Sequence, residues 1–245
     1  DDHRFLKAAF DTSIFTDESR EEIQFGYMRR STHNNTKEDI AKFEFSCHKY
    51  ADLSEGRYGV SVLNDCKYGV HVKEGSIWLS LHKGGCNPDF TGDKGKHRMM
   101  YSLLPHEGGF GMESVVRPAY RLNYPVMQGK QVAEALPALL EIDADNVICE
   151  AVKPCEDTQR AYIARLYEAE GSTVHARVRF GHAVTKVAEA NMLEEVQRDL
   201  PADGGVSLTF RPFEIKTIKV YYWGRGDSGG GGFSARSPSP GPPSE

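Results

Sequence analysis

The sequence of 245 residues lacks a long apolar run, an excess of basic residues and a secretory signal. One of its most apolar stretches, VAEALPALL, is far shorter than the roughly 20 residues that a membrane-spanning helix needs. The formal net charge of −5 argues against non-specific nucleic-acid binding, which requires a basic face to displace counterions. The first residues are charged, unlike a signal peptide. We therefore expect no membrane partner and no nucleic-acid partner.

Cysteine is scarce, and the five cysteines match neither a disulfide framework nor a C-x-x-C pair. This pattern predicts free thiols in a reducing compartment, the cytoplasm. The nine histidines are scattered, and no H-E-x-x-H motif occurs. His82 and Cys86 are four residues apart, but the stretch between them is typical of a loop. The sequence therefore predicts no metal site and no cofactor within this chain.

Signatures of catalysis are missing too, since there is no G-x-S-x-G elbow, phosphate-binding glycine loop or kinase motif. Glycoside hydrolysis usually requires two carboxylates at a fixed separation. The acidic candidates are Asp65, Asp89, Asp93, Glu107 and Glu113. The sequence alone places no two of them opposite each other, and a single acidic loop residue is more often solvated than catalytic.

What the chain does contain is alternating hydrophobicity, which predicts an all-β fold. Segment 42–49 would place Phe43, Phe45 and Cys47 on one face of a half-buried strand. Residues 69–81 predict a hairpin that turns at residues 73–75.

The tripeptide Tyr-Gly-Val occurs twice within residues 58–70. The spacing predicts a strand, a turn and a second strand, with alternate valines facing a core. These valines are Val60, Val62, Val70 and Val72. The turn between the strands contains Asn64, Asp65, Cys66 and Lys67.

A change of texture after residue 129 predicts two domains and a tail. Short strands then recur about every 10 to 15 residues, the rhythm of a β-sandwich. The predicted domains are 1–130 and 131–224, and Pro118 and Pro125 favour an ordered linker in the crossing segment. Residues 225–245 are mostly Gly, Ser and Pro, and are expected to be disordered.

Several motifs occur in an order that resembles one enzyme family. Residues 22–55 carry an arginine, a Thr-His-x-Asn-Thr pattern, an Asp-x-Ala-x-Phe-Glu pattern and the run HKYADLSE. Further matching stretches are 58–69, 114–125, 191–195 and 211–220. As a set they resemble the region after the catalytic domain in glycoside hydrolase family 38, the α-mannosidases, and most of all the cytosolic and vacuolar branch.

The resemblance implies part of a mutarotase-like super-sandwich followed by a smaller terminal β-sandwich. The family enzyme is a zinc-dependent retaining α-mannosidase. Its zinc ligands and Asp nucleophile belong to an N-terminal barrel that has no counterpart in this chain. The chain would then be an inactive C-terminal portion that acts as scaffold and pocket rim. Its expected partners are α-mannoside glycans and the missing catalytic domain, in the cytoplasm or a vacuole, and homo-oligomer formation stays open.

The same resemblance suggests rim residues. In relatives a basic residue just after the strand SIWLSL approaches the substrate, which matches Lys83 here, with His82 as the alternate. Relatives more often carry arginine there, and lysine lacks its planar fork. Asn64, Asp65 and Lys67 fit the same rim, since their groups suit sugar hydroxyls. The alternative is a plain turn, because Asn-Asp favours tight turns.

The sequence also allows two rival functions. One is a stand-alone carbohydrate-binding or interaction β-sandwich, in which Trp78 stacks on a sugar instead of packing between sheets. The other is a complete mutarotase-type enzyme that uses His97, His106 and Glu107 as acid and base, although no spacing supports it.

Overall fold

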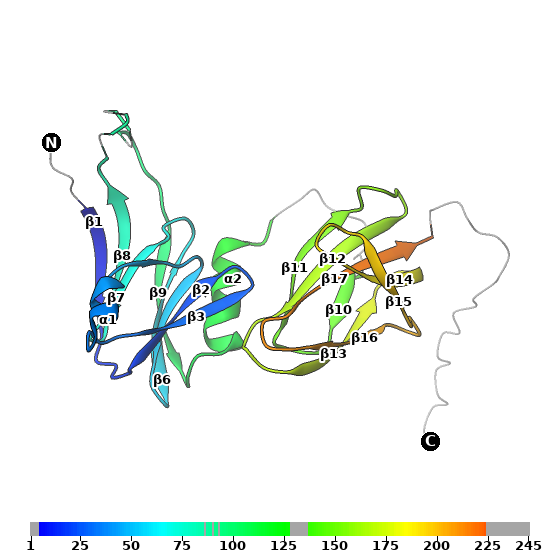
Figure 1. Ribbon diagram of the computed structural model, residues 1–245, viewed down its shortest axis with the longest axis horizontal. Coiled ribbons are helices and arrows are strands. Elements are labelled where there is room, and N and C mark those ends of the chain that lie inside the picture. Colours follow the sequence, from blue (N-terminus) through cyan, green and yellow to red (C-terminus); the bar gives the residue numbers. More distant parts are fainter. Residues whose placement is uncertain (1–4, 86, 90, 93, 128–136, 224–245) are drawn as a thin grey trace, which may run out of the picture.

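The computed structural model describes residues 5–85, 87–89, 91–92, 94–127 and 137–223, which form two β-sheet bodies joined by a short helical segment (Figure 1). The predicted boundary near residue 130 and the predicted disordered tail lie outside the described residues. No helix among the described residues is long and apolar enough to cross a bilayer.

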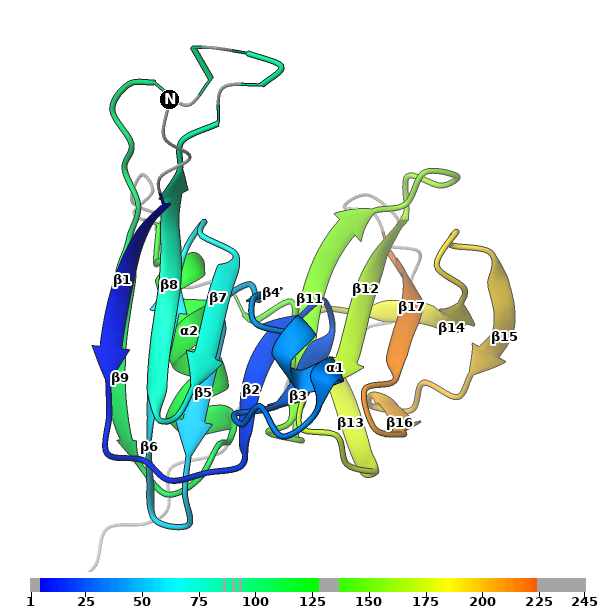
Figure 2. The same ribbon diagram turned by 60° about the vertical axis from the view of Figure 1, so that its left-hand side comes forward.

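The first body contains two antiparallel sheets, ordered β1-β8-β7-β4 and β3-β2-β5-β6-β9. Their strands are β1 (Phe5–Asp11), β2 (Glu18–Ile23), β3 (Gly26–Ser31), β4 (Phe45–Ser46), β5 (Tyr50–Ser54), β6 (Tyr58–Asn64), β7 (Gly69–Lys73), β8 (Ser76–Lys83) and β9 (Tyr101–Glu107). The sheets face each other, as Figure 2 shows, around a core that includes Ala51, Leu53, Val60, Val62, Val70, Val72, Ile77, Leu79 and Leu81. The predicted inward valines and the predicted hairpin at 73–75 are thus confirmed.

The turn between the two Tyr-Gly-Val strands crosses from one sheet to the other. Strand β6 pairs with β5 and β9, whereas β7 pairs with β8 and β4. The four valines still share one core, because the two sheets contribute opposite walls of it. The alternation therefore identified the buried faces but did not reveal the change of sheet.

The predicted strand over 42–49 is confirmed only at Phe45–Ser46, although Phe45 and Cys47 do pack in the core as predicted. A capping box between Thr36 and Asp39 starts helix α1 (Lys37–Ala41), which ends at Lys42. Because the helix occupies the residues before it, strand β4 begins only at Phe45 and is short. Phe43 lies before the strand and is 65% exposed instead of facing the core.

The crossing segment, predicted as an ordered linker flanked by Pro118 and Pro125, is helical. It comprises the π-helix η1 (Met112–Val116) and the α-helix α2 (Arg117–Asn123). Its buried residues, Met112, Val115, Val116 and Ala119, follow the helical period. Pro118 is tolerated because it lies in the first turn of α2, where its missing N–H is not needed.

The second body is a β-sandwich. Its sheets are ordered β11-β12-β17-β14-β15 and β10-β13-β16. Their strands are β10 (Leu140–Ile142), β11 (Val147–Pro154), β12 (Ala161–Glu168), β13 (Val174–Phe180), β14 (Val184–Ala190), β15 (Val196–Leu200), β16 (Val206–Phe210) and β17 (Ile215–Tyr222). Its core includes Leu166, Val178, Val187, Leu208, Phe210, Ile218 and Val220.

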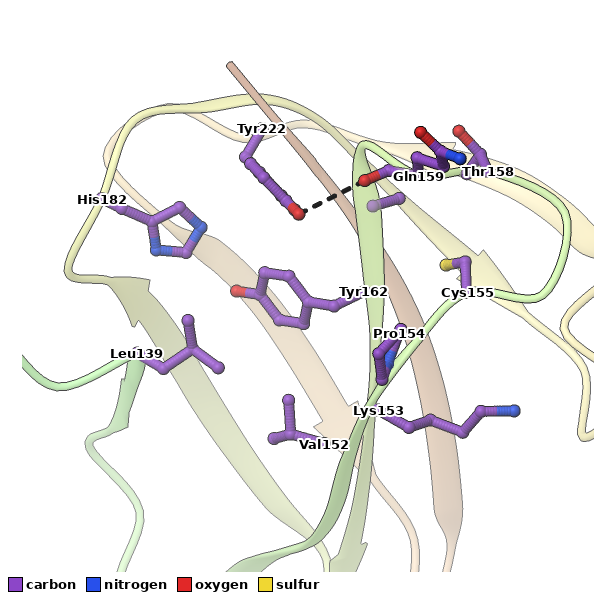
Figure 3. Close-up of a pocket in the computed structure, with 11 residues that line it drawn as sticks. Leu139, Val152, Lys153, Pro154, Cys155, Thr158, Gln159, Tyr162, His182 and Tyr222 are labelled. Carbon is purple, nitrogen blue, oxygen red and sulfur yellow. Dashed lines mark hydrogen bonds between the residues drawn. The ribbon is translucent and has the colours of Figure 1, made fainter. Parts of the chain in front are cut away.

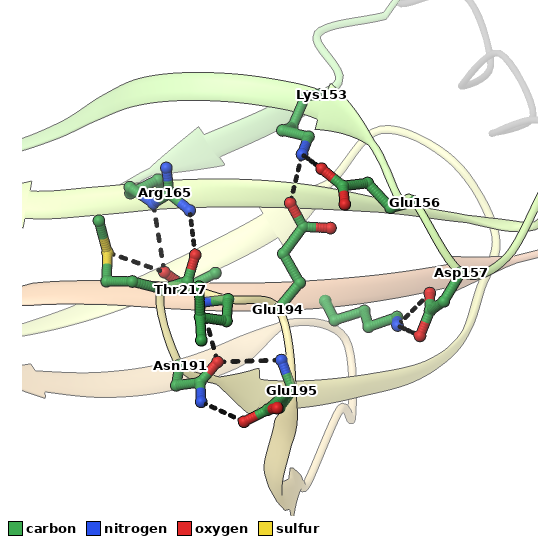
Figure 4. Close-up of polar contacts among 11 residues, drawn as sticks. Lys153, Glu156, Asp157, Arg165, Asn191, Glu194, Glu195 and Thr217 are labelled. Carbon is green, nitrogen blue, oxygen red and sulfur yellow. Dashed lines mark hydrogen bonds and ion pairs between the residues drawn. The ribbon is translucent and has the colours of Figure 1, made fainter.

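The turn at residues 191–195 is fixed to the outer face of this sandwich (Figure 4). The side-chain oxygen of Asn191 accepts the backbone N–H groups of Leu193 and Glu195 at 2.9 and 3.0 Å. Glu194 forms an ion pair with Lys153, which also lies 3.1 Å from Glu156. The ammonium of Lys153 is therefore occupied on this outer face.

The two bodies meet at a third apolar cluster built around η1 and α2. It combines Tyr27, Tyr50 and Leu63 of the first body with Tyr167 and Ala169 of the second. Hydrogen bonds cross the same joint, since the hydroxyl of Tyr27 donates to the Glu170 carbonyl at 3.1 Å. Apolar contact and backbone hydrogen bonds together fix the second body on the first.

One buried carboxylate organises the loop on the second body's side of this joint. Glu168 is fully buried and, among the described residues, has no cation within ion-pair distance. Its donors, at 2.8–3.3 Å, are the backbone N–H groups of Glu170, Gly171, Ser172 and Phe213, the hydroxyl of Ser172 and the amide of Asn146. Backbone dipoles thus replace a counter-ion.

Phe213 lies where the two bodies meet, and its ring packs between two glycines. A Cβ atom on Gly26 would lie 2.7 Å from its ring, and one on Gly171 would lie 2.9 Å from it. Both glycines also have positive φ angles, 153° and 79°, which disfavour other residues. The ring therefore fills a space that exists because both positions lack a side chain.

Replacing Glu168 with glutamine should destabilise the chain. The amide nitrogen of Gln would face N–H donors, and we expect the free energy of unfolding to fall by about 2–4 kcal/mol. Urea denaturation measures the change, and Glu141→Gln on the exposed side of β10 is the matched control. Equal stabilities for the two variants would contradict a structural role for Glu168.

Candidate functional site

Three of the five predicted rim residues line one cavity at the end of the first body's smaller sheet. The cavity measures about 380 Å³. Lys67 comes from the turn before β7, and His82 and Lys83 come from the end of β8. The other described lining residues are Phe5, Glu44, Gly69, Ser80, Leu81 and His97.

The remaining two predicted residues do not line this cavity and instead shape the turn beside it. Asn64 is buried; its amide N–H donates to the His48 carbonyl at 2.6 Å, and its oxygen accepts the Lys67 N–H at 2.7 Å. The Asp65 carboxylate accepts the N–H of Met100 at 3.0 Å. For Asn64 the structure thus favours the plain-turn alternative, while the turn itself presents Lys67.

The pKa values at the turn follow from these contacts. Burial raises the pKa of the Asp65 carboxyl, but hydrogen bonds from Cys66 and from the Met100 backbone outweigh it and hold the pKa below its usual value. The same hydrogen bond raises the pKa of the Cys66 thiol. Asp65 is therefore a charged residue that ties the turn to the start of β9.

The carboxylate in the cavity wall is already occupied. Glu44 accepts hydrogen bonds of 2.6 Å from the Lys7 ammonium and from the Ser80 hydroxyl. Lys7 first and Ser80 second hold the pKa of Glu44 below its usual value. Glu44 and Lys7 thus compensate each other and leave the cavity with a positive balance from Lys67 and Lys83.

The donors of the cavity stand next to an aromatic surface. The ammonium of Lys83 lies 5.3 Å from the centre of the Phe5 ring, a cation–π distance. The rings of His82 and His97 are 4.7 Å apart. Ammonium and imidazole groups around an apolar ring suit a hydroxyl-rich or anionic ligand.

Sequence reasoning missed the contributions of Phe5, Glu44 and His97 to this cavity. Phe5 pairs with Lys83 across the β1–β8 ladder, and a bulge after Leu6 shifts the register there. Long-range pairing of this kind leaves no local signal. The sequence did offer a signal for Gly69, because a glycine within a strand indicates the close approach of another group. In the structure, a Cβ atom at this position would lie 3.0 Å from Ser80.

The mutarotase-type trio does not come together as an acid–base site. His106 and Glu107 are neighbours on β9, so their side chains point to opposite faces of the sheet. The side chain of His106 is only 5% exposed, with its Nε2 2.9 Å from the Asp52 carboxylate, and His97 lies in the basic cavity. Trp78 does face away from Ile77 and is 42% exposed.

Asp52 and His106 form a buried polar cluster with two serines. The hydroxyls of Ser54 and Ser61 each donate to Asp52 at 2.6 Å. The imidazole of His106 lies against Gly59, where an added Cβ atom would approach it to 2.4 Å. Both glycines of the repeated Tyr-Gly-Val motif therefore make room for a side chain on the neighbouring strand.

Stability should depend on pH through His106. The hydrogen bond to Asp52 is the main reason that the pKa of His106 is raised above 6.5. A raised folded-state pKa means that this stabilisation is fully present below pH 6.5 and is lost as pH rises through the folded-state pKa. The free energy of unfolding of His106→Gln should therefore fall less steeply with pH than that of the unsubstituted chain.

Urea titrations at several pH values test this, with His175→Gln on the outer surface as control. Glu21 contributes to the same decline in both proteins, because burial raises its pKa to about 8. The difference between variant and parent isolates His106. Parallel pH profiles would show that the imidazole does not couple to folding.

Among the described residues, no group of three or more His, Cys, Asp or Glu side chains could hold a metal ion. The described cysteines are free thiols at positions 47, 66, 149 and 155.

Comparison with known protein families finds two matching domains. Residues 1–91 match the C-terminal domain of glycosyl hydrolase family 38, and residues 146–218 match the C-terminal β-sandwich domain of the same family. The two matches lie in the first and second bodies respectively.

Curated relatives agree with this result. The chain is 36% identical over 234 residues to alpha-mannosidase 2C1 of Homo sapiens, covering 88% of this chain and 22% of that protein. It is 35% identical over 230 residues to alpha-mannosidase G of Dictyostelium discoideum, covering 89% and 21%. The alpha-mannosidase of Saccharomyces cerevisiae is 31% identical over 245 residues, covering 90% and 22%. The chain thus spans about a fifth of the length of these relatives.

A solved structure shares the fold. An alpha-mannosidase from Enterococcus faecalis superposes with a TM-score of 0.70 at 16% identity, covering 88% of this chain and 25% of that one. The all-β, two-sandwich fold expected from the sequence is confirmed.

Proposed function

Because this chain carries the two C-terminal domains of glycosyl hydrolase family 38, we propose that it is the scaffold and pocket-rim portion of an α-mannosidase. In this proposal the substrates are α-mannoside glycans and the partner is an N-terminal catalytic domain. The observation that carries the rim assignment is the basic cavity, in which Lys67, His82 and Lys83 gather from separate elements.

Two open sheet edges support the scaffold role. Strands β1 and β9 end their respective sheets in the described part of the chain and lie on the same side of the first body (Figure 2). The rings of Phe10 and Tyr101 lie 6.0 Å apart between these strands. The two edge strands carry exposed apolar residues, which are Phe5 and Leu6 on β1 and Tyr101 and Leu103 on β9. Additional strands at this side would continue both sheets and cover those residues.

The chemistry of bond cleavage belongs, in this proposal, to the catalytic domain. A zinc ion held there would grip the sugar, and a carboxylate nucleophile would form the glycosyl-enzyme intermediate of a retaining enzyme. The described residues of this chain contribute donors to substrate hydroxyls and no pair of free carboxylates facing the cavity. The free thiols support a reducing compartment, which fits the cytoplasm, with a vacuole as the alternative.

A chimera tests the proposal. In the yeast alpha-mannosidase, the matched C-terminal region would be replaced by this chain, and hydrolysis of an aryl α-mannoside would be compared with the intact and truncated enzymes. We expect turnover from the chimera and none from this chain alone or from the truncated enzyme. A folded chimera without turnover, or turnover by this chain alone, would contradict the assignment.

The rim assignment has its own prediction within that chimera. Lys67→Met and Lys83→Met remove charge-assisted hydrogen bonds and should each raise KM about ten-fold with a smaller effect on kcat. Lys37→Met, on the exposed surface of α1, is the matched control. Unchanged KM values for both rim variants would remove these residues from the substrate pocket while leaving the scaffold role intact.

A further inference from the structure

The second body contains a larger cavity that the proposed function does not use. It measures about 620 Å³ and lies at the end of the sandwich where β11, β12 and β17 meet the loop after β13. Three rings, Tyr162, His182 and Tyr222, form one side, and aliphatic side chains such as Leu139 and Val152 form another (Figure 3). A mostly apolar wall with few polar groups is typical of small-molecule sites.

Three polar atoms among the described lining residues lack hydrogen-bond partners. Tyr162 is only 7% exposed, and its buried hydroxyl has no hydrogen-bond partner. Both ring nitrogens of His182 are likewise buried without a partner. Buried polar atoms are nearly always paired, so three orphans at one cavity point to a missing ligand. The hydroxyl of Tyr162 points toward the gap between His182 and Leu139 (Figure 3).

The orphan atoms define the chemistry of that ligand. A neutral imidazole offers one donor and one acceptor, and a tyrosine hydroxyl offers both. The hydroxyl of Tyr222 already donates to the Gln159 carbonyl at 3.4 Å, so it contributes its ring and not its polar tip. Adjacent hydroxyl groups on a ligand, each a donor and an acceptor, would satisfy the orphans of Tyr162 and His182 together.

The rings of Tyr162, His182 and Tyr222 pack together and form an angled apolar wall. The centre of the His182 ring lies 5.6 Å from that of Tyr162 and 6.0 Å from that of Tyr222. The two tyrosine rings are 6.1 Å apart and inclined by 38°. Aromatic faces that converge in this way fit the C–H face of a sugar ring.

The described lining residues offer no free charged group that would bind an ionic ligand. The one lysine in the described wall, Lys153, is held on the outer face by Glu194 and Glu156 (Figure 4). No acidic side chain is found among the described lining residues. The ligand is therefore uncharged.

We propose that this cavity binds one neutral hexose residue of a glycan, separately from the basic cavity of the first body. The sugar packs against the rings, and neighbouring hydroxyls pair with Tyr162 and His182. This site rests on the chemistry of the cavity alone, and the choice of mannose as first probe rests on the proposed function. A second site on one chain would raise the effective concentration of a branched glycan at the first.

Saturation-transfer NMR on the full chain tests the proposal with methyl α-mannoside, methyl β-glucoside and methyl β-galactoside. Tyr162→Phe removes only the orphan hydroxyl and should weaken binding about five- to ten-fold. Stability should be unchanged or higher, because no hydrogen bond is lost. Tyr221→Phe on β17 makes the same change on the opposite face of the sheet and should leave binding unchanged.

The outcomes separate clearly. Binding of any of the three sugars that is weakened by Tyr162→Phe and by His182→Leu supports the site. No binding of any of them, or binding that both variants leave unchanged, overturns it. Turnover by the chimera is measured independently, so failure of one proposal does not count against the other.

Discussion

The joint between the two bodies depends on how the buried carboxylate of Glu168 is satisfied without a cation. Four backbone N–H groups and two side chains converge on it, which fixes the loop from Glu170 to Ser172. That loop presents the Glu170 carbonyl to Tyr27 and the Glu170 side chain to the N–H of Met112 at the start of η1. The loop that Glu168 organises is therefore hydrogen-bonded to both the first body and the helical segment, and the shared apolar cluster completes the interface.

At the candidate site, too, one buried side chain holds a loop by bonding to backbone groups. The turn after β6 carries the chain between sheets, and Asn64 holds it by bonding two backbone groups. Lys67 is thereby brought to the end of the smaller sheet, beside His82 and Lys83. Asn64, Asp65 and Lys67 share one turn in the sequence, but they have different roles in the structure. The side chains of Asn64 and Asp65 are already hydrogen-bonded and shape the turn, whereas Lys67 lines the cavity.

Much of the core was predictable, because strand alternation encodes which side chains are buried. Val60, Val62, Val70 and Val72 show this, and the motifs identified the family whose domain models match residues 1–91 and 146–218. What the sequence hid was non-local. The change of sheet after Asn64, the pairing of Phe5 with Lys83 and the contact of Gly59 with His106 join residues far apart in the chain. The helix at 112–123 was missed because Pro118 and Pro125 suggested a linker, although its buried residues keep the helical period.

Phe213 and its two glycines have a consequence for how this chain can vary. The ring occupies space that Gly26 supplies from one body and Gly171 from the other, and both backbones have positive φ angles. A larger residue at either glycine would collide with the ring, and a smaller residue at 213 would leave both glycines facing a void. The three positions are up to about 190 residues apart in sequence. Substitutions at them should nevertheless occur together in relatives. The joint pattern would then show whether the two domains of a relative still dock in this way.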